Sequence, residues 1–159
     1  MQEDLLEQIS FVFIDPPLLF GGRALEWYGL RKGNDTDWML SKRVFQAMRQ
    51  TFPERYFNNA YGDEGIRLGK HEFFLSCFGY TYELLIPQAR QSYQYLVASP
   101  LVLLYLKIAT ALHEATNQKA WRDIHLLTKH LCFRGDDSYQ NQTNSILDHP
   151  TSEKKMEEA

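Results

Sequence analysis

Hydrophobic residues recur along this chain with two spacings, one typical of helices and one typical of strands. Apolar positions three and four residues apart predict helices over residues 4–15, 42–52, 100–114 and 118–130, and a short helix over 80–90. Apolar runs between turn residues predict strands at 18–20, within 31–41 and at 92–99. A glycine pair follows the first strand and opens a helix that ends at Gly29. Extended runs with glycine turns over 56–78 indicate two or three antiparallel strands.

The order of these elements predicts an α+β fold. We expect a mixed β-sheet packed on helices, formed as one domain by residues 1–133. The chain has 159 residues, of which 44% are hydrophobic and 14% aromatic, which is enough to build a core. Residues 134–159 turn polar and end in TSEKKMEEA, which predicts a solvated, flexible tail.

Charge and cysteine content narrow the classes of partner and the location. The formal charge of −3 gives no basic footprint for broad binding to duplex nucleic acid. Cys77 and Cys132 do not have the spacing of a metal or redox pair, so we expect buried free thiols. The first residues, MQEDLLEQIS, lack the pattern of a signal peptide, and the longest apolar run is short and interrupted by Lys107. We therefore expect a cytoplasmic protein without a membrane span.

Two aspartates one residue apart stand where a turn-like run becomes apolar, in RKGNDTDWMLS (31–41). If this stretch is a strand, Asp35 and Asp37 project from the same face, about 6–7 Å apart. Two like charges at that distance repel each other. Such a pair is solvated at an edge, neutralised by basic neighbours, or arranged to hold a cation. The pair alone leaves these alternatives open.

Four segments, in order, resemble the nucleotidyltransferase superfamily, whose members share the polymerase-β-like fold. GGRALEWYGLRKGNDTDWML (21–40) is similar to its glycine pair and Asp-x-Asp signature, and EFFLSCFGYTYELLIPQA (72–89) to the segment led by its third acid. LVLLYLKIATAL (101–112) and KAWRDIHLL (119–127) resemble the endings of nucleotidyltransferases associated with abortive infection and toxin–antitoxin systems. The likeness covers most of residues 18–131.

This resemblance implies transfer of a nucleoside monophosphate from a nucleoside triphosphate to an acceptor hydroxyl, which is RNA, protein or a small molecule. It implies Asp35, Asp37 and Glu72 as catalytic residues and as ligands of Mg²⁺ or Mn²⁺, with Glu72 also able to accept the proton of the acceptor. Paired cations about 3.5–4 Å apart can neutralise a triphosphate, and hard cations prefer oxygen ligands. The implied nucleotide-binding residues are Gly21, Gly22, Arg23 and Lys107. The implied setting is a bacterial toxin–antitoxin or phage-defence system, with an antitoxin or other protein partner.

Each assignment has a plainer alternative. Asp35 and Asp37 form a solvated edge if Arg31 and Lys32 offset them. Asp63 and Glu64 can replace Glu72 as the third acid. Lys107 can extend from an apolar helix to solvent. Lys119, Arg122 and Asp123 can form an exposed helical face instead of a cleft wall.

The chain also departs from the family pattern. Arg23 stands beside the glycines where a small hydroxyl residue is usual, and Thr36 replaces an apolar residue between the aspartates. Glu72 is longer than the more frequent aspartate, and Ala120 replaces the first acid of the ending. These departures leave a second hypothesis, a catalytically degenerate member that binds a nucleotide or a partner protein. A third is a structural α+β protein whose acids are solvated.

Overall fold

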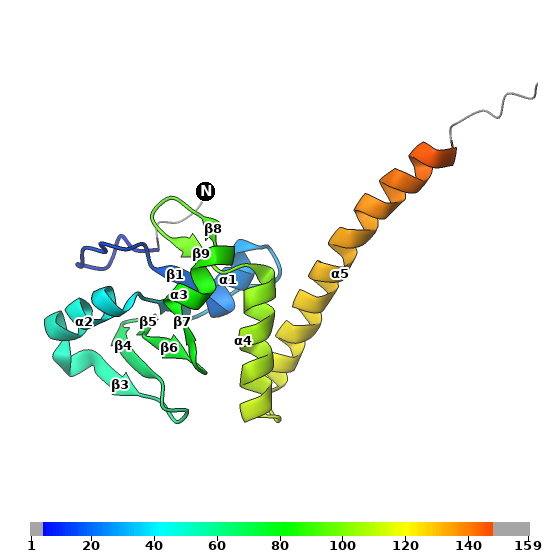
Figure 1. Cartoon of the computed structure of the whole chain (residues 1–159). Helices are drawn as coiled ribbons and strands as arrows, with labels where there is room; N and C mark the ends of the chain where they lie inside the picture. Colours follow the sequence, from blue (N-terminus) through cyan, green and yellow to red (C-terminus); the bar gives the residue numbers. More distant parts are fainter. Residues whose placement is uncertain (1–4, 148–159) are drawn as a thin grey trace, which may run out of the picture.

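The computed structural model describes the backbone of residues 5–147 and the side chains of residues 5–133. A mixed seven-stranded sheet forms its centre, in the order β3-β4-β5-β2-β1-β9-β8, which confirms the predicted α+β class (Figure 1). The strands of this sheet are β1 (Leu18–Phe20), β2 (Thr36–Met39), β3 (Tyr56–Asn58), β4 (Glu64–Leu68), β5 (His71–Phe74), β8 (Arg90–Gln91) and β9 (Leu96–Val97). A separate hairpin consists of β6 (Ser76–Cys77) and β7 (Tyr80–Thr81).

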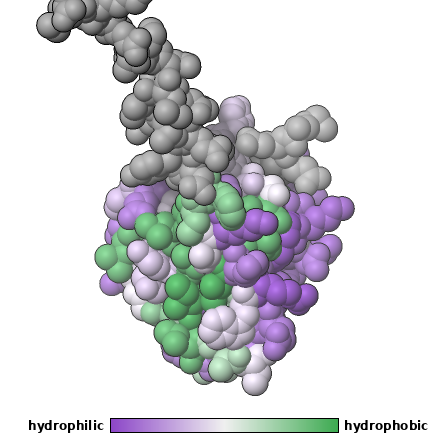
Figure 2. Space-filling view, turned by 90° about the vertical axis from the view of Figure 1, so that its right-hand side faces the viewer, coloured by the Kyte–Doolittle hydropathy of each residue, from purple (hydrophilic) through white to green (hydrophobic). Residues whose placement is uncertain are grey.

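Helices connect and flank these strands. They are α1 (Gly21–Trp27), α2 (Lys42–Thr51), α3 (Tyr82–Leu85), α4 (Pro100–His113) and α5 (Gln118–Leu147), with 3₁₀ turns at Pro53–Arg55 and Ile86–Gln88. α4 and α5 pack side by side, and α5 runs on beyond α4 and away from the sheet (Figure 1). Figure 2 views the molecule from the side of these two helices, where apolar side chains gather beside a hydrophilic region. Within residues 100–133, the large apolar side chains that are exposed on α4 and α5 are Leu101, Tyr105, Ile108, Leu112, Trp121 and Phe133.

In the middle of the sheet, side chains along β2 and β5 alternate between the two faces of the sheet. Trp38 and Phe73 are fully buried, and their rings stack with centroids 6.3 Å apart. Burial of two side chains of this size stabilises the fold by about 3–6 kcal/mol before entropy is counted. Because successive side chains of a strand point to opposite faces, Asp37 and Glu72 point away from this pair of rings. The apolar face therefore fixes the register that aligns the acids.

The N-terminal segment differs from the predicted helix over residues 4–15. Residues 5–8 form turns and residues 9–15 contain no helix, while residues 1–4 lie outside the described part of the chain. From Ile9 to Asp15, partly buried and exposed side chains alternate one by one, with Val12 and Ile14 on the solvent side. This is the period of an extended chain, and the aromatic residues Phe11 and Phe13 pack on the core. The helical spacing of the leucines misled the prediction.

The end of the last helix and the exposure of one cysteine also differ from the prediction. The last helix does not end at His130 but continues to Leu147, because a helix with no proline before Pro150 can extend into a polar sequence. Residues 148–159 of the predicted tail lie outside the described residues. Cys77 is buried as expected, but Cys132 is exposed. Within residues 5–147, no helix is long and apolar enough to cross a membrane.

Candidate functional site

Asp37 and Glu72 stand opposite each other on neighbouring strands. β2 and β5 are parallel, and their register pairs the Cα atoms of these two residues. Residues paired in this way project from the same face of the sheet. Both acids are partly exposed, whereas Met39 and Phe74, two residues further along the strands, are buried.

The predicted glycine turn lies directly against Asp37. Gly21 has a φ of +67°, and a Cβ atom there would lie 2.1 Å from Oδ2 of Asp37. Gly33 supports the same turn from its other side, because a Cβ atom on Gly33 would lie 2.5 Å from the carbonyl carbon of Gly22. The absence of side chains thus lets backbone and carboxylate approach closely.

A cavity of about 470 Å³ opens in front of these residues. Asp35, Asp37 and Glu72 line it, together with Gly22 and Lys107. The remaining lining residues are Asn34, Arg67, Gly69, Lys70 and Lys119. We call this hollow the acidic cavity. It joins the three acids named from the sequence with residues of the glycine turn and of both C-terminal helices.

Among the three acids of the acidic cavity, Asp37 has a clearly shifted pKa. Burial and the neighbouring Glu72 carboxylate raise the pKa of Asp37 from its ordinary value of 3.8 to about 6. Asp35 adds to this rise, whereas Lys107 and Lys119 oppose it. A carboxyl group held in this way gains from an approaching positive charge, either a proton or a cation.

Lys107 is held at the cavity by a buried acid. Asp123 has a side chain that is only 1% exposed, and its Oδ2 lies 2.9 Å from Nζ of Lys107. Arg31 donates two hydrogen bonds to the same carboxylate, from Nε at 2.5 Å and from Nη2 at 2.7 Å. Burial alone would raise the pKa of Asp123, but the bonds from Arg31 and Lys107 lower it below its ordinary value. Asp123 therefore fixes two cations beside the glycine turn.

The sequence prediction missed Arg67, which faces Glu72 from the next strand. The antiparallel pairing of β4 and β5 places Arg67 opposite Glu72, and the Arg67 Nε and Nη2 atoms lie 2.7 and 2.5 Å from Oε1 of Glu72. The sequence could have indicated this contact, because a two-residue turn at Gly69–Lys70 places Arg67 opposite Glu72 in an antiparallel pair. Lys70 in that turn also lines the acidic cavity.

Several residues considered from the sequence lie elsewhere. Arg23 does not line the acidic cavity and donates instead to Glu26 at 2.7 Å. Asp63 is buried and accepts hydrogen bonds from the backbone N–H of Phe78 and from Asn59, which makes it a structural acid. Glu64 accepts bonds from Tyr56 and Arg49. Arg122 is exposed on α5 and does not line the acidic cavity.

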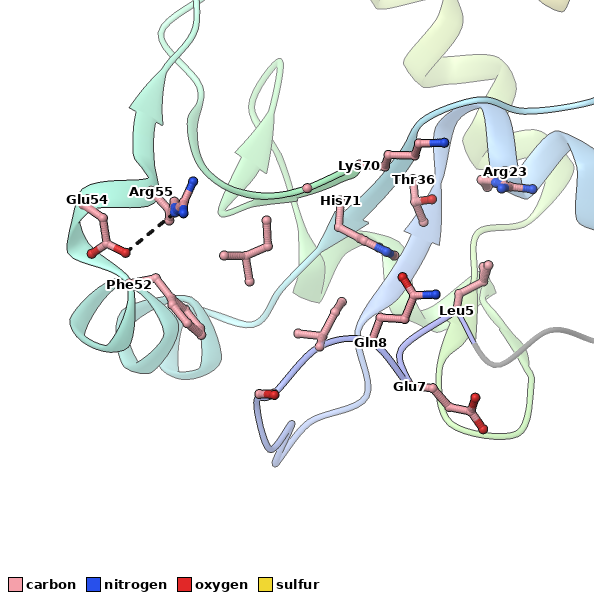
Figure 3. A pocket seen from close by; sticks show the side chains of 14 residues that line it. Leu5, Glu7, Gln8, Arg23, Thr36, Phe52, Glu54, Arg55, Lys70 and His71 are labelled. Carbon is pink, nitrogen blue, oxygen red and sulfur yellow. Dashed lines mark ion pairs between the residues drawn. The ribbon is translucent and has the colours of Figure 1, made fainter.

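A second cavity, of about 1100 Å³, borders the opposite face of β2 and β5 (Figure 3). Thr36 and His71 point into it, and Arg23 and Lys70 lie at its border. The indole Nε1–H of Trp38 donates to Nδ1 of His71 at 3.0 Å, so the neutral imidazole carries its proton on Nε2. Burial, together with the charge of Arg23, lowers the pKa of His71. The two cavities share Gly69 and Lys70 in their linings.

The acidic cavity suits a hard cation only in combination with another ligand. Among residues 5–133, no group of three or more His, Cys, Asp or Glu side chains is arranged to hold a metal ion. Mg²⁺, however, is usually bound by one or two carboxylates plus water and substrate phosphates rather than by a complete protein cage. Asp37 and Glu72 provide such a pair, with the charge of Asp35 close by. The donor set therefore fits a cation that enters together with a phosphate ligand.

No match was found with the models of protein families, with curated proteins or with solved structures.

Proposed function

We propose that the acidic cavity binds a nucleoside triphosphate with Mg²⁺ or Mn²⁺ and transfers the nucleoside monophosphate to an acceptor hydroxyl. The observation that carries this proposal is the in-register pairing of Asp37 and Glu72 at a cavity that Gly22 and Lys107 also line. The resemblance to nucleotidyltransferases predicted these residues from sequence motifs far apart in the chain. Their gathering in one cavity supports that interpretation.

Each group has a role that its position allows. Asp37 and Glu72 would hold the cation, and Asp35 would add negative charge at the cavity mouth. A bound cation of this kind neutralises the triphosphate and lowers the pKa of an attacking hydroxyl. Lys107, held by Asp123, would contact phosphate oxygens, and the bare backbone at Gly22, which lines the cavity, would leave room for them, whereas the Asp37 carboxylate fills the space beside Gly21.

The proposed reaction is an in-line displacement at the α-phosphorus. The acceptor oxygen forms a bond to the α-phosphorus, and the bond from that phosphorus to the bridging oxygen of the β-phosphate breaks. Pyrophosphate leaves with the electrons of the broken bond. The hydroxyl proton passes to a carboxylate at the cavity or to solvent.

A catalytically degenerate binding protein is the second candidate, and one observation favours it. Glu72 is already paired with Arg67, so the third acid of the set is engaged by the protein itself. A protein that keeps this pair would bind a nucleotide through Lys107 and the glycine turn without turnover. The resemblance also suggests a toxin–antitoxin or phage-defence setting with a protein partner, and both candidates are compatible with that setting.

Label transfer tests the proposal directly. The protein is incubated with each of the four ribonucleoside triphosphates labelled at the α-phosphate, with Mg²⁺ or Mn²⁺, and with total RNA, total protein and small hydroxyl compounds as acceptors. We expect one nucleotide to label one acceptor class and to release pyrophosphate. Replacement of both Asp35 and Asp37 by Asn should abolish labelling while the protein stays folded.

A binding measurement separates the two candidates. Thermal melting with and without nucleotide and metal should show stabilisation in wild type, because a ligand that binds only the folded state raises its melting temperature. The Asp35→Asn, Asp37→Asn double variant should lose the metal-dependent part of that shift. Stabilisation without transfer to any acceptor favours the degenerate binder, and wild type without any shift excludes both nucleotide hypotheses.

A further inference from the structure

Arg67 forms an ion pair in the acidic cavity that contrasts with the other cation contacts there. Both of its contacting nitrogens reach the same oxygen, Oε1 of Glu72, at 2.7 and 2.5 Å. The Arg67 side chain is 58% exposed and that of Glu72 is 26% exposed. Ion pairs exposed to solvent contribute little net free energy, so this pair can open at small cost.

The basic side chains that contact Asp123 are held more firmly. Asp123 is almost completely buried, and its two oxygens are engaged by Arg31 and Lys107. Loss of the Asp123 carboxylate would leave both basic side chains without their shared counter-charge, so this acid holds them more firmly than an exposed carboxylate would. The acidic cavity thus has one cationic side chain, Lys107 of α4, that is held by a buried acid, and one, Arg67 of β4, whose ion pair is exposed to solvent.

We propose that Arg67 exchanges partners: it neutralises Glu72 in the ligand-free protein and contacts the triphosphate when a nucleotide enters, which frees Glu72 for the cation. This inference rests on the function proposed above. Arg67 lines the acidic cavity beside Lys70, and its guanidinium also lies over the ring of Phe57, 4.8 Å from the centroid, so the exchange would break that contact as well as the pair with Glu72. A guanidinium also matches two phosphate oxygens at once, in the way that it matches a carboxylate.

The exchange makes the binding of metal and of nucleotide interdependent. A cation beside Glu72 would face the positive charge of Arg67 in the ligand-free protein, which weakens binding of the metal alone. The triphosphate removes that repulsion because it attracts Arg67 to itself. By linkage, nucleotide must then increase metal affinity by the same factor by which metal increases nucleotide affinity. Loss of Arg67 should reduce this coupling factor.

Titration of Mn²⁺ measures the coupling without any turnover. Free Mn²⁺ is followed by its paramagnetic resonance signal, in the absence and in the presence of the α,β-methylene analogues of the four ribonucleoside triphosphates. In Arg67→Gln we expect Mn²⁺ alone to bind about fivefold more tightly, analogue binding to weaken by about tenfold, and the coupling factor to fall by about tenfold or more. Arg67→Lys should lie between wild type and Arg67→Gln, because it keeps the charge but loses the planar fork.

Arg43→Gln is the matched control, because Arg43 is also an exposed arginine paired with a carboxylate, that of Asp15, and it does not line the acidic cavity. It should leave all Mn²⁺ and analogue affinities at wild-type values. A wild-type coupling factor in Arg67→Gln, or weaker binding of Mn²⁺ alone, overturns the exchange but leaves the proposed function intact. Wild type that binds neither Mn²⁺ nor any analogue overturns both.

Discussion

A Cβ atom on Gly21 would lie 2.1 Å from Oδ2 of Asp37, so a residue of the glycine turn and the central acid occupy adjoining space. Asp37 in turn pairs with Phe20 across β1 and β2, which joins the strand, the turn and the acid into one rigid unit. The Asp37 carboxylate can therefore occupy its position only because residue 21 has no side chain.

Gly21→Ala should test this contact. We expect a loss of about 1 kcal/mol from the positive φ and at least about 1 kcal/mol more from the displaced Asp37 carboxylate. Gly29→Ala is the control, since Gly29 has a φ of +71° but open space around its Cβ position. Urea unfolding of both variants checks the difference. Equal losses would show that the packing of Gly21 against Asp37 contributes nothing.

Asp37→Asn should make the metal-free protein more stable and abolish metal-dependent label transfer. The pKa of Asp37 in the folded protein, about 6, lies above its ordinary value of 3.8, so the folded state holds the charged form at a cost. That cost is absent below about pH 4 and complete above about pH 6, where it reaches up to about 3 kcal/mol.

Urea unfolding of wild type and Asp37→Asn in chelator, at several values from about pH 4 to about pH 8, measures this dependence. The variant should gain on wild type as pH rises and lose that advantage as pH falls. If both proteins keep a constant difference across the range, Asp37 is not strained by burial and Glu72. Asn at position 37 keeps the shape of the side chain, which makes it the suitable replacement.

Much of the acidic cavity could be predicted from the sequence because its parts are local. Asp35, Asp37 and the glycine pair fall within one stretch. Both acids line the cavity, but Asp35 lies in a bend before β2, so the alternation expected of a strand does not apply to this pair. The opposite position of Arg67 and Glu72 was also predictable, since the turn at Gly69–Lys70 joins Leu68 directly to His71. The prediction considered only the acids of this segment, so it did not include Arg67 among the residues of the site.

The rest depends on contacts between distant parts of the chain. Arg31 and Asp123 are 92 positions apart, and neither residue type indicates its partner. Spacing on α5 indicates that Lys119 and Asp123 lie close together, but not that Asp123 is buried under Lys107. The helix predicted for the N-terminal segment was wrong for a different reason. Its leucines fit a helical period, whereas Phe11 and Phe13 fit an extended one.

Acid should weaken a contact that joins the N-terminal segment to α2. Hydrogen bonds from Arg43 and from Ser41, the N-cap of α2, lower the pKa of Asp15 to about 2. Because the folded pKa lies below the ordinary value of 3.8, this contact stabilises the protein above about pH 4 and is lost as pH falls toward 2. Arg43→Gln should lower the stability near neutral pH and have much less effect near pH 2. Unfolding curves of both proteins across that interval would show whether the difference disappears.

Asp123 and Lys107 should separate stability from nucleotide binding. Asp123→Asn leaves Arg31 and Lys107 without their shared counter-charge, so we expect a loss of about 3 kcal/mol. Lys107→Met leaves Asp123 bonded twice to Arg31, so its cost should be about 1 kcal/mol. A negative replacement of Lys107 would face the buried Asp123 and confuse the two effects, which is why Met is chosen.

Lys107→Met should nevertheless weaken analogue binding by about tenfold, because the acidic cavity loses a cation. Calorimetric titration of the folded variant measures this loss. Unchanged analogue affinity in a stable Lys107→Met protein would exclude Lys107 from the proposed nucleotide site and leave it as a structural partner of Asp123.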